Sequence, residues 1–141
     1  MEVIIRKTRQ EDFSGILKIL LESHLISTSF TKSQFLTLLR KNRSCCYVAE
    51  INKKLVGTVF GMHDGALYGY IYKIAIIKDY RRFRIATRLL KELIDQFRKQ
   101  GIQVIFAHVK RKNTPSFKLL RSLDFEVRNT HLLMDLGYKK R

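Results

Sequence analysis

Apolar residues recur every three or four positions in the first third of the chain, which indicates amphipathic helices. A short apolar stretch at residues 2–7 precedes them and predicts a strand. Thr8 can start the first helix because Glu11 stands at the reciprocal position of a capping box. Thr31, with a glutamine three positions later, repeats this arrangement. A second helix is therefore expected over residues 31–41.

The pattern then changes to runs of β-branched and aromatic residues, which are typical of strands. Polar or glycine-containing breaks at residues 52–54 and 64–65 separate the runs and are short enough to be tight turns. Three successive strands joined in this way predict an antiparallel meander. The runs are residues 45–51, 55–62 and 66–77.

Helical spacing returns at residues 85–99, and Gly101 follows as a stop signal. Residues 102–109 are apolar at nearly every position, which predicts a strand buried on both faces. Thr114 and Pro115 then begin another helix, with proline in its first turn. Short strands are expected at residues 125–127 and 132–136.

The predicted element order is β-α-α-β-β-β-α-β-α-β-β, which defines an α/β (α+β) fold. We expect a mixed, mainly antiparallel sheet with a central parallel strand pair and helices on both faces. A length of 141 residues with 45% hydrophobic residues suits a single domain over residues 1–141. The carboxyl ends of the parallel strands are the expected place for a ligand crevice.

Composition narrows the classes of function. No apolar stretch approaches the roughly 20 residues that cross a bilayer, and charges interrupt the first apolar run, so we expect a cytoplasmic protein without a membrane association. The neighbouring residues Cys45 and Cys46 are expected to be buried thiols. The four histidines show no ligand spacing, so no metal is expected.

The formal net charge of +16 predicts a positive field over much of the surface. Such a field favours anionic partners, among them nucleic acid, the ribosome, an acidic protein or a phosphate-rich cofactor. A polyamine substrate would be repelled. A basic composition without functional meaning is the plainer alternative.

Residues 74–90 pass from a strand through a basic turn into a helix, and they resemble the acetyl-CoA signature of the GCN5-related N-acetyltransferases. That signature reads (Gln/Arg)-x-x-Gly-x-(Gly/Ala). Arg81 and Ala86 match its first and last positions, whereas Arg84 stands where the family has its first glycine. The resemblance covers the whole chain in element order, and its specific motifs occupy residues 74–125.

The resemblance implies an acetyl-CoA site. Free N–H groups at a helix start, with the positive end of the helix dipole behind them, form a cradle for a pyrophosphate. The main chain of the preceding strand would pair with the pantetheine arm, and Asn113 would lie beside the cofactor or cap the next helix. The expected cofactor-binding residues are Ile74, Ala75, Ile76, Arg81, Arg82, Phe83, Arg84, Ile85, Ala86, Thr87 and Asn113.

Acetyl transfer to an amine needs a base, and His108 is the candidate. It ends the expected buried strand, where the family's ribosomal-protein N-terminal acetyltransferases carry a glutamate. An ordinary hydrogen-bonded histidine is the alternative. Leu120 stands where many members have a tyrosine acid. The acid would then be water or one of Tyr72, Tyr80 and Tyr138.

The leading interpretation is an acetyl-CoA-dependent N-acetyltransferase that acts directly on an amine, in motif layout closest to the ribosomal-protein enzymes. The amine could belong to a protein amino terminus, a lysine or a small molecule. Arg84, Leu120 and Asp124 depart from the family pattern and favour an alternative, a non-catalytic module that binds an anionic partner such as nucleic acid. Another acyl-CoA is a third option. The open sheet edge near the C-terminal strands suits a homodimer.

Overall fold

The computed structural model describes residues 2–23 and 30–136. It contains two compact units, residues 1–108 and 109–141, which we describe separately. The single domain expected over the whole chain stays a prediction. The first unit contains β1 (Ile4–Lys7), η1 (Gln10–Asp12), α1 (Phe13–Glu22), α2 (Lys32–Lys41), η2 (Arg43–Cys45), β2 (Cys46–Ile51), β3 (Lys54–His63), β4 (Tyr68–Ile76), η3 (Lys78–Tyr80), α3 (Ile85–Lys99) and β5 (Val104–Ala107). The second unit contains α4 (Thr114–Ser122).

The five strands form one sheet in the order β1-β2-β3-β4-β5. The pairs from β1 to β4 are antiparallel, and β4 pairs with β5 in parallel. Both the antiparallel meander and the parallel crossover through α3 are thereby confirmed. Asn52 and Lys53 make the tight turn between β2 and β3 with φ values of 50° and 66°, the left-handed geometry that two-residue hairpins favour.

Local capping sets the helix starts. Thr31 caps α2 as expected, since its hydroxyl accepts the Gln34 N–H at 3.1 Å and the Gln34 side chain accepts the Thr31 N–H at 2.9 Å. The first helix is present, but the prediction that Thr8 caps it was wrong. α1 follows Asp12, whose carboxylate accepts the Arg9 N–H at 2.7 Å, whereas Thr8 is buried and caps nothing.

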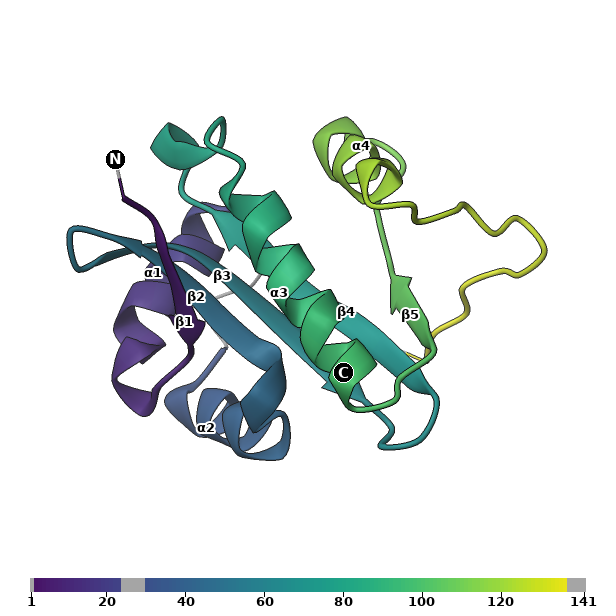
Figure 1. Cartoon of the computed structure of the whole chain (residues 1–141), viewed down its shortest axis with the longest axis horizontal. Helices are drawn as coiled ribbons and strands as arrows, with labels where there is room; N and C mark the ends of the chain where they lie inside the picture. The colour runs from purple at the N-terminus through teal and green to yellow at the C-terminus, as the bar shows by residue number, and fades with distance from the viewer. Residues whose placement is uncertain (1, 24–29, 137–141) are drawn as a thin grey trace, which may run out of the picture. The chain divides into compact units, whose positions relative to one another are not determined.

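Helices cover the two faces of the sheet. Helix α3 crosses one face (Figure 1) and packs closely on β3, where a Cβ added to Gly57 would lie 3.2 Å from Leu89 Cδ1 and one added to Gly61 would lie 2.6 Å from Leu93 Cδ1. The other face packs against α1 and α2. Its buried core consists of Ile16, Ile19, Leu20, Phe35, Leu39, Cys46, Val48, Phe60 and Ala75.

Two predictions from the second half of the chain were wrong. Strand β5 is not buried on both faces, because Val104 and Phe106 are 39% and 40% exposed. Residues 125–136 form no strand. A strand exists only through hydrogen bonds to a neighbouring strand, and within the described part of the chain these residues pair with none.

The two cysteines are free and buried, as expected. Burial raises the pKa of the Cys46 thiol to about 12, which makes that thiol a poor nucleophile. The same cause raises the pKa of Cys45. Within residues 2–23 and 30–136, no helix combines the length and apolar content that crossing a bilayer requires.

Candidate active site

The start of helix α3 presents a row of unbonded backbone donors. The first N–H group to bond into the helix is that of Arg88, which donates to the Arg84 carbonyl at 3.1 Å. The N–H groups of residues 82–87 donate to no group among the described residues, and no side chain caps the helix. With the positive end of a 15-residue helix behind it, this row is suited to an anion such as a pyrophosphate.

Arg84 holds the position of the expected glycine in the left-handed region, with φ 57° and ψ 25°. That conformation costs a side chain about 1–2 kcal/mol relative to the right-handed one. Arg84 is nevertheless exposed, so its guanidinium is available to an anion. The substitution therefore keeps the backbone shape that glycine usually supplies and adds a positive charge.

Arg81 ties this turn to the sheet. Its Nε donates to the Ile76 carbonyl at 2.9 Å, at the end of β4. Ile85, the first residue of α3, is 1% exposed and packs into the core, so only its main chain faces a ligand. Phe83 is half exposed and contacts the Tyr80 ring at a centroid distance of 6.3 Å. The predicted cofactor residues of the first unit therefore form a continuous path from β4 to the helix start.

The parallel strands separate next to this path. Pairing between β4 and β5 ends at Ile71 and Ala107, whereas β4 continues to Ile76 (Figure 1). The main chain of residues 72–76 therefore has no β5 neighbour. An extended molecule that carries amide groups can bind along such an edge in the way an added strand does.

A β-bulge lies at the same point. Phe60 pairs with Lys73 and Gly61 pairs with Ile71, so Tyr72 is an extra residue on β4 with no partner on β3. Bulges bend a strand and re-aim its side chains, and they often lie beside active sites. Here the bulge coincides with the residue at which the two parallel strands separate.

His108 follows β5 directly and is exposed. Its imidazole meets the Tyr70 ring edge to face, with centroids 5.3 Å apart. Tyr70 also contacts Phe106 at 5.6 Å, and Phe106 contacts Tyr68 at 5.5 Å. An exposed row of rings therefore runs along β4 and β5 to the candidate base.

Sequence reasoning identified His108 but not Tyr70. The two residues are far apart in the chain and meet only because Tyr70 pairs with Phe106, which places the ring next to the residue two positions after Phe106. The alternation of tyrosines at Tyr68, Tyr70 and Tyr72 was a usable signal, since alternate residues of a strand share a face.

The remaining predicted residues belong to the second unit or fall outside the described residues. Asn113 belongs to the second unit, where its Oδ1 accepts the Ser116 N–H at 3.2 Å and caps α4. Leu120 is a residue of the same helix. Tyr138 lies outside the described residues. A role of Asn113 beside the cofactor stays a prediction.

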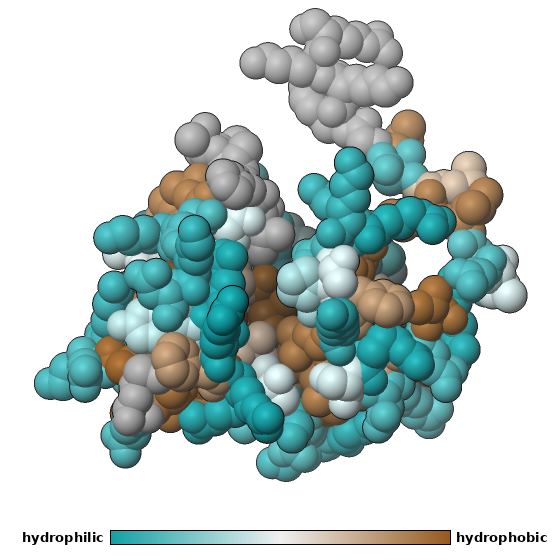
Figure 2. All heavy atoms as spheres, turned by 90° about the horizontal axis from the view of Figure 1, so that it is seen from above, coloured by the Kyte–Doolittle hydropathy of each residue, from teal (hydrophilic) through white to brown (hydrophobic). Residues whose placement is uncertain are grey.

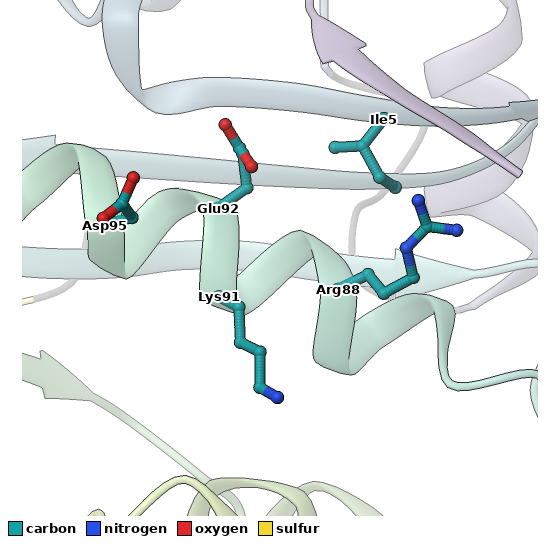
Figure 3. Close-up of a pocket in the computed structure, with 5 residues that line it drawn as sticks. All are labelled: Ile5, Arg88, Lys91, Glu92 and Asp95. Carbon is teal, nitrogen blue, oxygen red and sulfur yellow. The ribbon is translucent and has the colours of Figure 1, made fainter.

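Hydrophilic side chains cover most of the face in Figure 2, with smaller apolar groups between them. A shallow groove of about 570 Å³ lies between β1 and the outer side of α3, where Arg88 points toward Ile5 and Lys91 points away from it (Figure 3). Glu92 and Asp95 also line the groove, and their carboxylates make it less suited to an anion. Among the described residues, no group of three or more His, Cys, Asp or Glu side chains is placed to hold a metal ion.

The sequence profile of the acetyltransferase (GNAT) family matches residues 5–125. The chain belongs to this family.

Two curated relatives are similar to this chain over part of their length. A probable N-acetyltransferase, camello, of Xenopus tropicalis is 26% identical over 124 residues, which are 84% of this chain and 57% of that protein. N-alpha-acetyltransferase 30 of Schizosaccharomyces pombe is 32% identical over 83 residues, which are 56% of this chain and 55% of that protein. The chain therefore spans little more than half the length of these relatives.

Solved structures share the fold. Ard1 from Thermoplasma volcanium superposes with a TM-score of 0.83 at 18% identity, covering 91% of this chain and 85% of that one. The PaiA N-acetyltransferase from Thermoplasma acidophilum, solved in complex with coenzyme A, gives 0.80 at 19% identity, covering 93% and 94%. A ribosomal-protein-alanine N-acetyltransferase from Brucella melitensis gives 0.73 at 18% identity, covering 96% and 100%.

Proposed function

We propose that this protein transfers an acetyl group from acetyl-CoA directly to an amine. The observation that carries the proposal is the row of unbonded N–H groups over residues 82–87, which begins where Arg81 anchors the turn to the end of β4. An anion cradle and a gap between parallel strands lie next to each other in this arrangement. A coenzyme A thioester carries both a diphosphate and an extended arm with amide groups.

The chain's residues fit such a ligand. The unbonded N–H groups and the exposed guanidinium of Arg84 would hold the diphosphate. The main chain of residues 72–76, which has no β5 neighbour, would pair with the amide-bearing arm. Bound there, acetyl-CoA would supply the acetyl group as an activated thioester. The same backbone would accept a longer acyl chain, so the acyl preference is a matter for experiment.

His108 would accept the proton that the amine loses as it becomes acylated, either directly or through one water molecule. The edge-to-face contact with Tyr70 supports this role because it limits how the imidazole can turn. Tyr70 is in this view a positioning residue. Tyr70 and the bulge residue Tyr72 are two positions apart on β4.

Leu120 stands at the position where many family members have a tyrosine, and its side chain cannot donate a proton. The reaction does not depend strictly on such a donor, because a free thiol has a pKa of about 8.5 and its thiolate is a fair leaving group. We therefore expect slow turnover and not absence of turnover.

The names of the relatives support an amine acceptor. One relative is an N-alpha-acetyltransferase, and a complex named NatC, of the same fold, was solved with a Gag peptide and coenzyme A. An acceptor that is a protein amino terminus fits both. Association with nucleic acid or the ribosome, a homodimer and a cytoplasmic location stay predictions from composition and sequence.

The first test is calorimetric titration of acetyl-CoA into the full chain at moderate salt, with ADP as the control for unspecific attraction of phosphate. Saturable binding clearly tighter than that of ADP, followed by release of free thiol when an amine is added, is the expected result. Binding no tighter than that of ADP would refute the cofactor site. Steep loss of affinity for nucleic acid with rising salt would then support the alternative, a basic binding module.

A further inference from the structure

Phe83 is an exposed aromatic residue inside the basic turn that leads into α3. It is 50% exposed, and its chain neighbours Arg82 and Arg84 are exposed as well. A single exposed apolar residue is ordinary on a protein surface. Phe83 differs because it belongs to the row of residues 82–87, whose N–H groups donate to no group among the described residues. An aromatic ring therefore stands beside the anion cradle.

Tyr80 supports the Phe83 ring. The two ring centroids are 6.3 Å apart and the ring planes are inclined by 50°, a separation at which aromatic pairs attract each other. Tyr80 is half-buried, and its N–H donates to the Ile77 carbonyl at 2.9 Å, so it is itself held in place. Among the described residues, no other ring contacts Phe83. The contact limits how the Phe83 ring can turn and leaves the remainder of its surface open to a ligand.

The connectivity of coenzyme A brings its base to this turn. One end of the diphosphate carries the arm with amide groups, which we propose to pair with residues 72–76 of β4. The other end carries adenosine, which is joined through a single methylene group. Phe83 is the second residue of the N–H row. A diphosphate bound to that row therefore holds the adenosine only a few bonds from the turn.

The turn combines the two kinds of side chain that bind a nucleotide. Cationic groups attract the phosphates, and aromatic rings offer a face on which a base can stack. Arg82 and Arg84 are the exposed cations, and Phe83 is the exposed ring between them. The guanidinium groups attract any phosphate, whereas the ring adds a contact only for a ligand that carries a base.

We propose that Phe83 binds the adenine of acetyl-CoA by stacking and is thereby a specificity-determining residue of the cofactor site. This inference rests on the proposed acetyltransferase function. The stacking contact selects thioesters of coenzyme A over thioesters of phosphopantetheine alone, the form in which a carrier protein holds an acyl group. Both ligands carry a phosphate and the amide-bearing arm, and only the first carries a base.

The first test is calorimetric titration of the full chain with three ligands: acetyl-CoA, ADP and S-acetyl phosphopantetheine. Phe83→Ala should weaken the binding of acetyl-CoA and of ADP about five- to a hundredfold, the range of base stacking on an aromatic side chain. The affinity for S-acetyl phosphopantetheine should stay within about twofold, because that ligand has no base to stack. ADP should remain the weaker of the two adenine ligands, since it lacks the arm.

Conservative variants separate stacking from support of the turn. Phe83→Tyr keeps the aromatic face and should retain most of the affinity for acetyl-CoA. Phe83→Leu keeps an apolar side chain without that face and should show most of the loss. A residue that only packs on Tyr80 to shape the turn would give the opposite order, or would weaken all three ligands alike.

A fluorescent reporter provides a second measurement that does not depend on activity. The chain contains no tryptophan, so Phe83→Trp introduces a single indole into the turn. Stacked adenine should quench its fluorescence when acetyl-CoA or ADP binds, and S-acetyl phosphopantetheine should not. Tyr68→Trp is the matched control for absorption of light by adenine, because Tyr68 lies at the far end of β4 from Ile76, roughly 25 Å away along the strand.

The possible failures are distinguishable. Unchanged affinity for acetyl-CoA in Phe83→Ala, or an equal loss for all three ligands, would overturn the role of Phe83 and leave the acetyltransferase function standing. Quenching of the Phe83→Trp variant by single-stranded oligoadenylate but not by acetyl-CoA would assign the ring to nucleic acid and overturn the role as well. Absence of acetyl-CoA binding by the folded, unchanged protein would overturn both the role of Phe83 and the proposed function.

Discussion

The imidazole of His108 meets the ring of Tyr70 edge to face across two parallel strands, with centroids 5.3 Å apart. The contact forms at the end of the paired region, where β4 and β5 begin to separate. Tyr70 belongs to β4 and His108 follows β5, so the pairing of these two strands sets the contact. The separation of the strands beyond it is where we propose that the cofactor arm lies, and the imidazole is the group that we propose as the proton acceptor.

If His108 is the base, His108→Ala should lower kcat by about 10²- to 10⁴-fold. The affinity for acetyl-CoA should stay close to that of the unchanged protein, because the cradle at residues 82–87 is untouched. Steady-state kinetics with calorimetric binding separates the two quantities. Unchanged turnover would reject the role of His108.

If Tyr70 positions the imidazole through its ring, Tyr70→Phe should retain most of the turnover and Tyr70→Ala should approach the loss seen without His108. Tyr68→Ala is the matched control, since Tyr68 contacts Phe106 and not the imidazole. A large loss of turnover in Tyr70→Phe would instead show that the tyrosine hydroxyl group, and not the ring, is required.

Arg84→Gly tests two properties of the cofactor turn at once. Glycine removes the cost of the left-handed conformation, about 1–2 kcal/mol, but adds about 0.5–1 kcal/mol of chain entropy in the unfolded state. We therefore expect a gain in the free energy of unfolding of about 0.5–1 kcal/mol. Loss of the guanidinium should weaken acetyl-CoA binding about two- to fivefold, the range of an exposed ion pair.

Arg84→Ala is the control, because it removes the charge and keeps the backbone cost. It should weaken binding to the same extent without the gain in stability. Tighter binding by Arg84→Gly than by the unchanged protein would mean that the arginine obstructs the cradle. Calorimetry and urea unfolding together distinguish these results.

The sequence predicted the helices well where the signals are local. Helix α2 begins at its capping box, and α3 has the expected bounds because an amphipathic stripe is followed by Gly101. Longer-range features were missed. The bulge at Tyr72 depends on the register with β3, and residues 125–136 lack the partner that a strand requires.

The candidate site likewise divides into local features, which the sequence predicts, and contacts between distant residues, which it does not. The basic turn from Arg81 to Arg84 could be read directly, because its residues are consecutive and lead into a helix. The neighbours Tyr70 and His108 could not, since nothing local in the sequence fixes which strands are adjacent. Thr8 illustrates a third case: its side chain caps no helix, and the nearby Asp12 carboxylate accepts the Arg9 N–H and two hydrogen bonds from Arg6.

That Arg6–Asp12 pair predicts a dependence of stability on pH. Burial alone would raise the pKa of the Asp12 carboxyl, but the Arg6 guanidinium, which donates to both carboxylate oxygens at 2.9 Å, holds the pKa below its ordinary value. A lowered pKa in the folded state stabilises the protein above the unfolded pKa of about 3.9, and this contribution is lost as the pH falls through the folded pKa.

Asp12→Asn should therefore reduce the free energy of unfolding at pH 7 by about 1.5–3 kcal/mol, the value of hydrogen bonds to a charged group. The difference from the unchanged protein should shrink as the pH falls below the unfolded pKa of about 3.9 toward the lower pKa of folded Asp12. Urea unfolding at pH 7 and pH 3 measures both. Asp95→Asn, which removes an exposed pair with Lys99 at 3.2 Å, should change stability by less than about 1 kcal/mol and serves as the control.

Close packing of α3 on the sheet gives the last prediction. A Cβ at Gly61 would lie 2.6 Å from Leu93 Cδ1 and 2.9 Å from Phe97 Cζ, distances that force the helix or these side chains to move. Gly61→Ala should therefore lower the free energy of unfolding by about 1–3 kcal/mol, the usual cost of overpacking a core. At Gly69 the nearest atoms are 3.1 Å and 3.3 Å away, so Gly69→Ala should cost less.

A double variant tests the cause. Leu93→Ala alone should cost about 2–5 kcal/mol through the cavity it leaves. Combined with Gly61→Ala, it removes the closest clash, so the double variant should lose less than the two single losses added together. Strict additivity in urea unfolding would show that Gly61 is required for a reason other than the approach of α3.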